Sequence, residues 1–214
     1  MSVINGTFNQ IVKASRNFGG ALVVFEGKPE LLVGGFNFKL DDLPAPGDVL
    51  PCGTPVYCDE SARTITPVIT AKVAVVDSID AKIVTLADNG FGQTAIKVGD
   101  VVGLLPATLS SAATYYATVN KKDGNVITLS GTITGLAADS VLAIVDGTTH
   151  KIKAVPNALL PYDVVRDADA ISVDGDGAWK NDRPVLERRM PPVNDAIKTA
   201  LANAGCQFKW SDRK

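Results

Sequence analysis

The chain carries the same β-pattern twice in its middle third. Residues 71–86 read AKVAVVDSIDAKIVTL, and residues 116–129 read YATVNKKDGNVITL. Each copy starts with an alternating strand, passes a polar turn and continues in a second strand that ends in Thr-Leu. A third strand follows each copy, at 98–105 (VGDVVGLL) and at 138–145 (ADSVLAIV). Two copies of a three-strand unit close readily into a small barrel or sandwich, so this repeat predicts a scaffold.

The two copies align with a changing offset. Ile83–Leu86 lines up with Val126–Leu129, an offset of 43 residues, and Asp100 then matches Asp139, an offset of 39. The loop between the second and third strands is therefore expected to be shorter by about four residues in the second copy. We expect the whole barrel to occupy residues 68–146.

Composition narrows the classes of function. The chain has 21 Lys and Arg against 23 Asp and Glu, and its basic residues are scattered instead of forming the stripe that nucleic-acid binding usually needs. No eighteen apolar residues run together, so we expect no membrane span, and the first twenty residues lack the apolar stretch of a secretory signal. A soluble chain made in the cytoplasm is expected.

The residues before the barrel predict an arm and a hairpin. Residues 1–20 are polar and are expected to be extended. Ala21–Glu26 and Glu30–Leu40 suggest two strands about a Gly-Lys-Pro turn, with Phe36 and Phe38 on one face of the second strand.

The residues after the barrel predict one helix. Ile197, Ala200, Leu201 and Ala204 fall on one face at helical spacing, which predicts a helix over 192–204. Gly205 is a good terminator, and a short final strand should follow at Cys206–Trp210. The Asp- and Gly-rich residues 166–184 read as a long loop or weak hairpin, and Val185–Arg189 as a strand.

The sequence offers no catalytic set. His150 is the only histidine and stands in Gly-Thr-Thr-His-Lys, with no G-x-S-x-G elbow in the chain, so a surface or strand-edge histidine is expected. Cys52, Cys58 and Cys206 make neither a disulfide framework nor a zinc pattern, and they fit reduced thiols. We predict no enzyme, no cofactor and no metal.

Two features remain open at this stage. Five aspartates could supply oxygen ligands to a hard cation, but EF-hand spacing is absent and a solvated turn is the simpler interpretation; they are Asp163, Asp167, Asp169, Asp174 and Asp176. Trp179 lies in a polar stretch and must either fold back onto its own core or insert into a partner.

Two segments that bracket the barrel resemble lambda-type head-decoration proteins of tailed phages. Residues 49–56 (VLPCGTPV) resemble that family's Leu-Pro-Ala-Gly-Thr strand, and Thr64–Pro67 its next strand, which ends in proline. Residues 155–164 (VPNALLPYDV) resemble its later apolar segment, and the strand and helix of 185–204 occupy the place of its last elements. The match covers roughly 49–67 and 155–204, and the chain is also similar to auxiliary capsid and head-fibre proteins of crAss-like gut phages.

The resemblance implies a mainly β fold: a decoration-like base domain formed by 21–67 and 147–214, an inserted barrel and one C-terminal helix. It also implies a structural virion protein that docks on the major capsid protein, often as a homotrimer, with no nucleic-acid or membrane partner. The chain would be synthesised in the host cytoplasm and end on the capsid surface. The residues expected at the capsid or subunit interface are Asn9, Arg16, Asn17, Phe18 and Trp179.

Two other classes compete with this interpretation. A β-only surface of low net charge also suits a carbohydrate- or surface-binding module. An enzyme is the third class, and its carboxylates would come from Asp163, Asp167 and Asp169.

Overall fold

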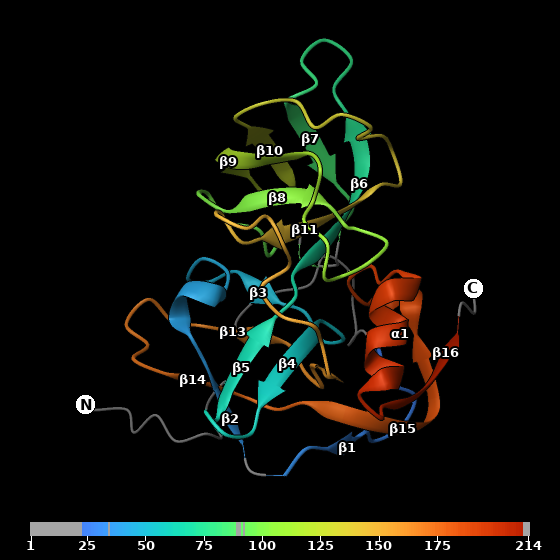
Figure 1. The fold of residues 1–214 in the computed structure, drawn as a ribbon. Coiled ribbons are helices and arrows are strands. Elements are labelled where there is room, and N and C mark those ends of the chain that lie inside the picture. The colour runs from blue at the N-terminus through green and yellow to red at the C-terminus, as the bar shows by residue number, and fades with distance from the viewer. Residues whose placement is uncertain (1–22, 34, 89–90, 92, 212–214) are drawn as a thin grey trace.

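Six strands from the middle of the chain close into a barrel, which stands on a second β-structure made from the residues before and after it (Figure 1). The computed structural model describes residues 23–33, 35–88, 91 and 93–211. Neighbours around the barrel follow the order β10-β7-β6-β11-β8-β9, and every pair is antiparallel. The strands are β6 (Thr70–Val76), β7 (Ile83–Leu86), β8 (Val101–Leu104), β9 (Tyr116–Asp123), β10 (Val126–Leu129) and β11 (Val141–Val145). The expected mainly β fold with a small barrel and a C-terminal helix is confirmed.

The two sequence copies are related by an approximate two-fold axis. Strands β6, β7 and β8 form the first copy, and β9, β10 and β11 form the second. Equivalent strands pair with each other: Val84 lies opposite Ile127, and Gly103 lies opposite Ala143. A register shift interrupts β6–β7 and β9–β10 at the same equivalent place. The duplication therefore extends to the hydrogen-bonding pattern.

The pairing corrects the alignment made from sequence. Ser140, and not Asp139, is the structural equivalent of Asp100. Each side chain accepts a hydrogen bond from the backbone N–H three residues earlier, at 2.9 Å from Lys97 to Asp100 and at 3.1 Å from Ala137 to Ser140. Asp139 instead corresponds to Gly99, and both have positive φ angles. An Asp in both copies misled the alignment because Asp and Ser fill the same turn position.

The barrel interior follows from the alternation of each strand. β-branched and leucine side chains on one face point inward, and their neighbours point outward. Equivalent positions are buried in both copies. The four interior pairs are Val73 and Val119, Val84 and Ile127, Leu86 and Leu129, and Val102 and Leu142.

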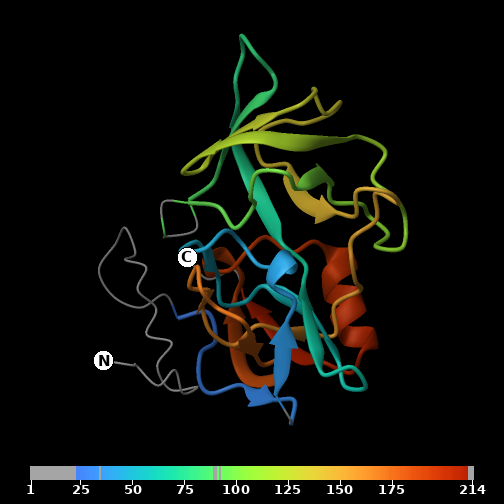
Figure 2. The ribbon, with the colours of Figure 1, turned by 90° about the vertical axis from the view of Figure 1, so that its left-hand side faces the viewer.

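The base is a mixed sheet ordered β1-β15-β12-β4-β5-β2-β14, with β16 parallel to β15. A two-stranded sheet, β3 with β13, completes it. The strands are β1 (Glu30–Leu31), β2 (Phe36–Phe38), β3 (Val49–Leu50), β4 (Pro55–Asp59), β5 (Thr64–Pro67), β12 (Ala158–Leu159), β13 (Val164–Val165), β14 (Val173–Gly175), β15 (Ala178–Leu186) and β16 (Gln207–Ser211). Figure 2 shows the barrel and base stacked from a second side.

The expected hairpin around Gly27 is wrong. Phe25 forms a bridge with Val185, and β1 pairs with the earlier part of β15. The rest of the second expected strand forms β2, which pairs with β5 and β14, so the two expected strands do not pair with each other. Phe36 and Phe38 are nevertheless buried on one face of β2, as their alternation predicts. Burial against the long strand outweighed the local turn signal.

The helix α1 (Asp195–Asn203) is shorter than the predicted 192–204. The Asn194 side chain accepts a hydrogen bond from the Ile197 N–H at 2.9 Å, and this N-cap sets its start. Ile197 and Leu201 are buried against the base, whereas Ala204 is exposed. Gly205, with a φ of 87°, ends it as expected.

The segment around β15 also differs from expectation. The strand begins at Ala178, seven residues before the predicted Val185, and stops at Leu186. A 3-10 helix, Glu187–Arg189, occupies the rest of the predicted strand. The Asp- and Gly-rich stretch is thus partly regular structure, because Ala178 and Val185 are buried in the base core.

Candidate functional site

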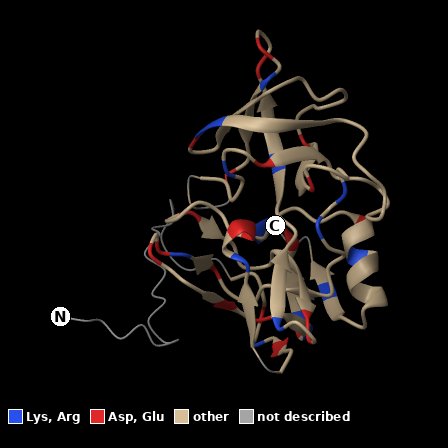
Figure 3. Ribbon diagram, turned by 60° about the vertical axis from the view of Figure 1, so that its left-hand side comes forward, with Lys and Arg blue, Asp and Glu red and all other residues tan. Residues whose placement is uncertain are grey.

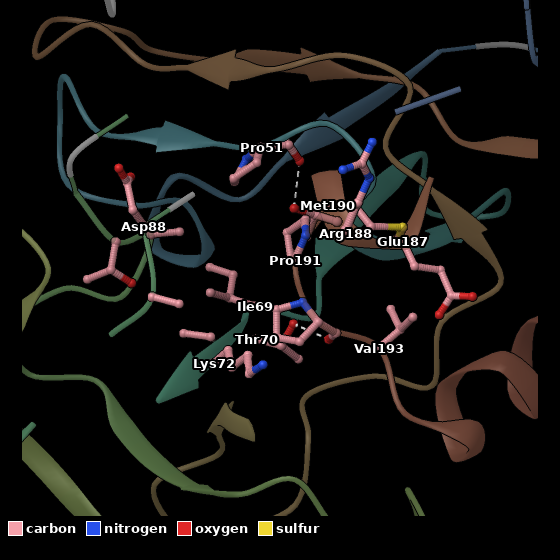
Figure 4. A pocket seen from close by; sticks show the side chains of 16 residues that line it. Pro51, Ile69, Thr70, Lys72, Asp88, Glu187, Arg188, Met190, Pro191 and Val193 are labelled. Atoms are coloured by element: carbon pink, nitrogen blue, oxygen red, sulfur yellow. Dashed lines mark hydrogen bonds between the residues drawn. The ribbon is translucent and has the colours of Figure 1, made fainter. Parts of the chain in front are cut away.

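A cleft of about 470 Å³ lies where the barrel meets the base (Figure 4). Its walls come from the start of β6, the loop after β7, the turn before β4 and the segment 187–193 that leads to α1. Ile69, Met190 and Pro191 give it apolar walls. Lys72, Asp88, Glu187 and Arg188 add charge.

Several polar side chains that line the cleft are engaged in hydrogen bonds or ion pairs with other residues of the chain. Thr70 donates its hydroxyl to the Pro192 carbonyl at 2.7 Å, a bond between barrel and base. Lys72 pairs with Asp139 at 2.7 Å, and Glu187 pairs with Lys198 of α1 at 2.6 Å. The described residues that line the cleft include no histidine or cysteine.

Three lysines join the barrel and the adjoining segment to an acidic stretch of the base. Lys122 of β9 forms an ion pair with Asp48, and both side chains are largely buried. Lys97 donates to the carbonyls of Asp41 and Leu43, at 2.5 and 2.8 Å. Lys153 pairs with Asp42 at 2.6 Å. These contacts fix the barrel on the base.

Asp100 lies beside this joint. Burial raises the pKa of its carboxyl, although the Lys97 N–H bond and the charges of Lys97, Lys153 and Lys122 act in the opposite direction. Its equivalent in the other copy is the neutral Ser140. The carboxylate is therefore not needed for the turn itself.

His150 is not placed as a catalytic base. Its ring stacks on Tyr116 with centroids 3.5 Å apart and planes at 20°. Its Nδ1 is buried and has no hydrogen-bond partner among the described residues. The thiols are poor nucleophiles, because burial raises the pKa of Cys58 to about 12 and that of Cys206 to about 11. None of the three cysteines, all of which lie in the described part of the chain, forms a disulfide.

The five aspartates do not gather into a metal site. Asp163 accepts a hydrogen bond from the Cys52 N–H at 2.8 Å, and Asp176 accepts one from the Tyr162 hydroxyl at 2.9 Å. Within the part of the chain that the structure describes, no group of three potential ligands is close enough to hold a metal ion. Asp174 lies in β14, and Asp163 and Asp176 are half-buried, so the expected solvated turn describes only the exposed Asp167 and Asp169.

The predicted interface residues fall in two places. Trp179 lies in β15, not in a loop, and is half-buried between Ala178 and Lys180. Asn9, Arg16, Asn17 and Phe18 lie outside the described residues. Sequence reasoning assigned nothing to Tyr115 and Tyr116, although two adjacent aromatic residues ahead of a strand were a visible signal.

Charges are mixed over the whole ribbon. Figure 3 shows lysines and arginines interspersed with aspartates and glutamates on both the barrel and the base. No helix among the described residues has the length and apolar character needed to cross a membrane.

Comparison with known proteins gives no relative. No family model, curated protein or solved structure matches the chain.

Proposed function

We propose that this chain is a structural virion protein that docks on the outside of a bacteriophage capsid and decorates or stabilises it. One observation carries the proposal. The two segments that resemble decoration proteins are about a hundred residues apart in sequence, yet they are neighbours in the base sheet. β12 pairs with β4 through Ala158 opposite Val56, and β4 pairs with β5. A single unit split by an insertion would leave this arrangement.

The position of the barrel supports the same assignment. The chain enters it after β5 and leaves it after β11, and the two crossings lie together, since Ile144 donates its N–H to the Ile69 carbonyl at 3.0 Å. The barrel projects from one side of the base, and the hairpin between β6 and β7 reaches farthest from it (Figure 1). Such an arrangement suits a base that docks and a knob that faces outward.

The base presents apolar side chains to solvent. Val33 and Ile171 flank β2 and β14, and Ile171 is 95% exposed. β14 is also the last strand of the sheet among the described residues, and its outer edge pairs with no described strand. We propose that this edge takes part in the contact with a neighbouring chain. We propose that this region buries against the major capsid protein, and that the chain assembles as a homotrimer on the virion surface.

Co-sedimentation with undecorated capsids tests the docking. Ile171→Asp should weaken binding at least about tenfold, because it places a charge in a buried apolar contact. Ile79→Asp is the matched control, since Ile79 is 96% exposed at the barrel hairpin. It should bind like the natural chain. No co-sedimentation of the natural chain at micromolar concentration would refute docking.

Sedimentation velocity tests the assembly separately. A homotrimer should give three times the 22.4 kDa mass of the chain. A monomer in solution that also binds capsids as isolated copies would contradict the trimer while leaving docking intact.

A further inference from the structure

Two adjacent tyrosines are exposed where the second copy of the barrel begins. Tyr115 is 47% exposed and Tyr116, the first residue of β9, is 45% exposed. The equivalent of Tyr116 in the first copy is Thr70, which is 6% exposed and bonded to the base. The barrel thus does not need an aromatic ring at this position.

The ring of Tyr116 is held by His150. The imidazole of His150 covers one face of the Tyr116 ring, with the two ring centroids 3.5 Å apart. The backbone of His150 has a φ of 54°, which is uncommon for a residue other than glycine. Two backbone bonds impose that conformation: His150 N–H to the Asp146 carbonyl at 2.9 Å, and Ala113 N–H to the His150 carbonyl at 2.8 Å. Strain of this kind persists where the surroundings enforce it, and it gathers at binding sites.

The support beneath the tyrosines is equally specific. β8 passes under them at Gly103, where an added Cβ would lie 2.7 Å from the Ala113 Cβ and 3.1 Å from the Tyr115 carbonyl oxygen. The turn that carries His150 is tightened by Asp146, which accepts from the N–H groups of Thr148 and Thr149. The ring of Tyr116 is therefore presented by a rigid support, which lowers the entropy lost on binding.

The polar groups nearby in the chain are mainly neutral hydroxyls. The loop before the tyrosines exposes Ser110, Ser111 and Thr114, and the His150 turn exposes Thr148 and Thr149. The charged residues within four positions of His150 are one acid, Asp146, and two bases, Lys151 and Lys153, and Lys153 is paired with Asp42. Nucleic-acid binding needs a surface with clustered positive charge, and the residues around the two tyrosines do not form such a surface. Aromatic faces beside hydroxyl groups match a ligand that has both C–H faces and hydroxyls.

We propose that Tyr115, Tyr116 and His150 form a binding platform for a neutral saccharide. The C–H face of a sugar ring packs against Tyr115 and against the face of the Tyr116 ring that His150 does not cover. Neighbouring serine and threonine hydroxyls form hydrogen bonds with the hydroxyls of the sugar. The site lies on the barrel and does not depend on capsid docking. Because the platform is shallow, its Kd is expected to be on the order of 1 mM for a disaccharide.

Saturation-transfer NMR on the full chain tests the proposal. The probes are lactose, maltose, cellobiose, mannobiose and diacetylchitobiose, each up to about 20 mM, well above the expected Kd. At least one should show transfer from the protein, and Tyr116→Ala should weaken it about tenfold or more. Tyr116→Phe keeps the ring face and should retain most of the binding. Tyr57→Ala, an exposed tyrosine of β4, is the matched control and should change nothing.

Two results would overturn the platform: no transfer from any of the five sugars, or binding that survives the double variant Tyr115→Ala/Tyr116→Ala. A thermal melt close to that of the natural chain shows that the double variant is folded. The same variant should co-sediment with capsids normally, so loss of sugar binding and loss of docking are separable.

Discussion

The two halves of the barrel share an interior and differ at its surface. Val84 and Ile127 meet at the approximate two-fold axis, and both are fully buried. At the outer positions the two copies differ. Thr70 of the first copy forms a hydrogen bond with the base, whereas its equivalent in the second copy, Tyr116, stacks on His150. Folding constrains the inward positions in both copies, whereas the outward positions are free to serve contacts.

The ends of the barrel differ in the same way. Val76 in the first copy packs against the core, and its equivalent Lys122 reaches Asp48 of the base. The turn after Asp77 exposes Ile79, whereas the equivalent turn after Asp123 is the tight pair Gly124 and Asn125. The contact of Lys122 with the base and the proposed tyrosine platform thus both lie at positions where the two copies differ in sequence.

The interior should be sensitive in both halves. Ile127→Ala is expected to lower the free energy of unfolding by about 3 kcal/mol, since it leaves a cavity at a fully buried site. Val84→Ala should cost about 2 kcal/mol, less because fewer methyl groups are lost. Urea denaturation measures both. A negligible loss at either position would break the equivalence of the two interiors.

The ion pair of Lys122 with Asp48 has no counterpart in the first copy, where Val76 takes the place of Lys122. Lys122→Met should destabilise by about 2 kcal/mol, because it leaves Asp48 largely buried without its partner. The neighbouring Lys121 is exposed, and Lys121→Met should change stability by less than about 0.5 kcal/mol. Equal melting temperatures for the two variants would mean that the ion pair does not hold the barrel in place.

The support of the tyrosines is expected to show steric coupling. Gly103→Ala should cost about 1–2 kcal/mol, because the new methyl group meets Ala113 and the Tyr115 carbonyl. Adding Ala113→Gly should recover part of the loss, and a double-mutant cycle measures that coupling. Gly131→Ala meets nothing within 4 Å and is the control. Absence of coupling would show that the contact is not tight.

The sequence supported some of these features and not others. The repeat predicted the barrel because its strands alternate regularly, and Gly205 marked the end of the helix closely. The hairpin at Gly27 failed because Phe25 found a partner in Val185, far along the chain. The tyrosine platform joins Tyr116 to His150 through a loop conformation, and no local pattern encodes that meeting.

The smallest expected effect concerns Asp100 and its neutral equivalent Ser140. Burial raises the pKa of Asp100, so the unfolded chain loses this proton at lower pH than the folded one. Its contribution to stability therefore falls as pH rises from the ordinary aspartate pKa through the raised one. Asp100→Ser keeps the hydrogen-bond acceptor of the turn and removes this pH-dependent loss of stability. Across that pH window the stability of the variant should therefore rise relative to that of the natural chain, by less than about 1 kcal/mol.

Urea unfolding at several pH values between about 3 and 7 measures the gain, because that range begins below the ordinary aspartate pKa and extends well above it. Asp139→Asn is the control: Asp139 is the residue that sequence alone pairs with Asp100, and its ion pair with Lys72 is exposed. It should shift stability by less than about 0.5 kcal/mol. If Asp100→Ser instead loses stability at neutral pH, attraction to Lys97, Lys122 and Lys153 outweighs burial. The carboxylate would then belong to the lysine joint, and the departure of Asp100 from Ser140 would be one more step by which one copy became fixed to the base.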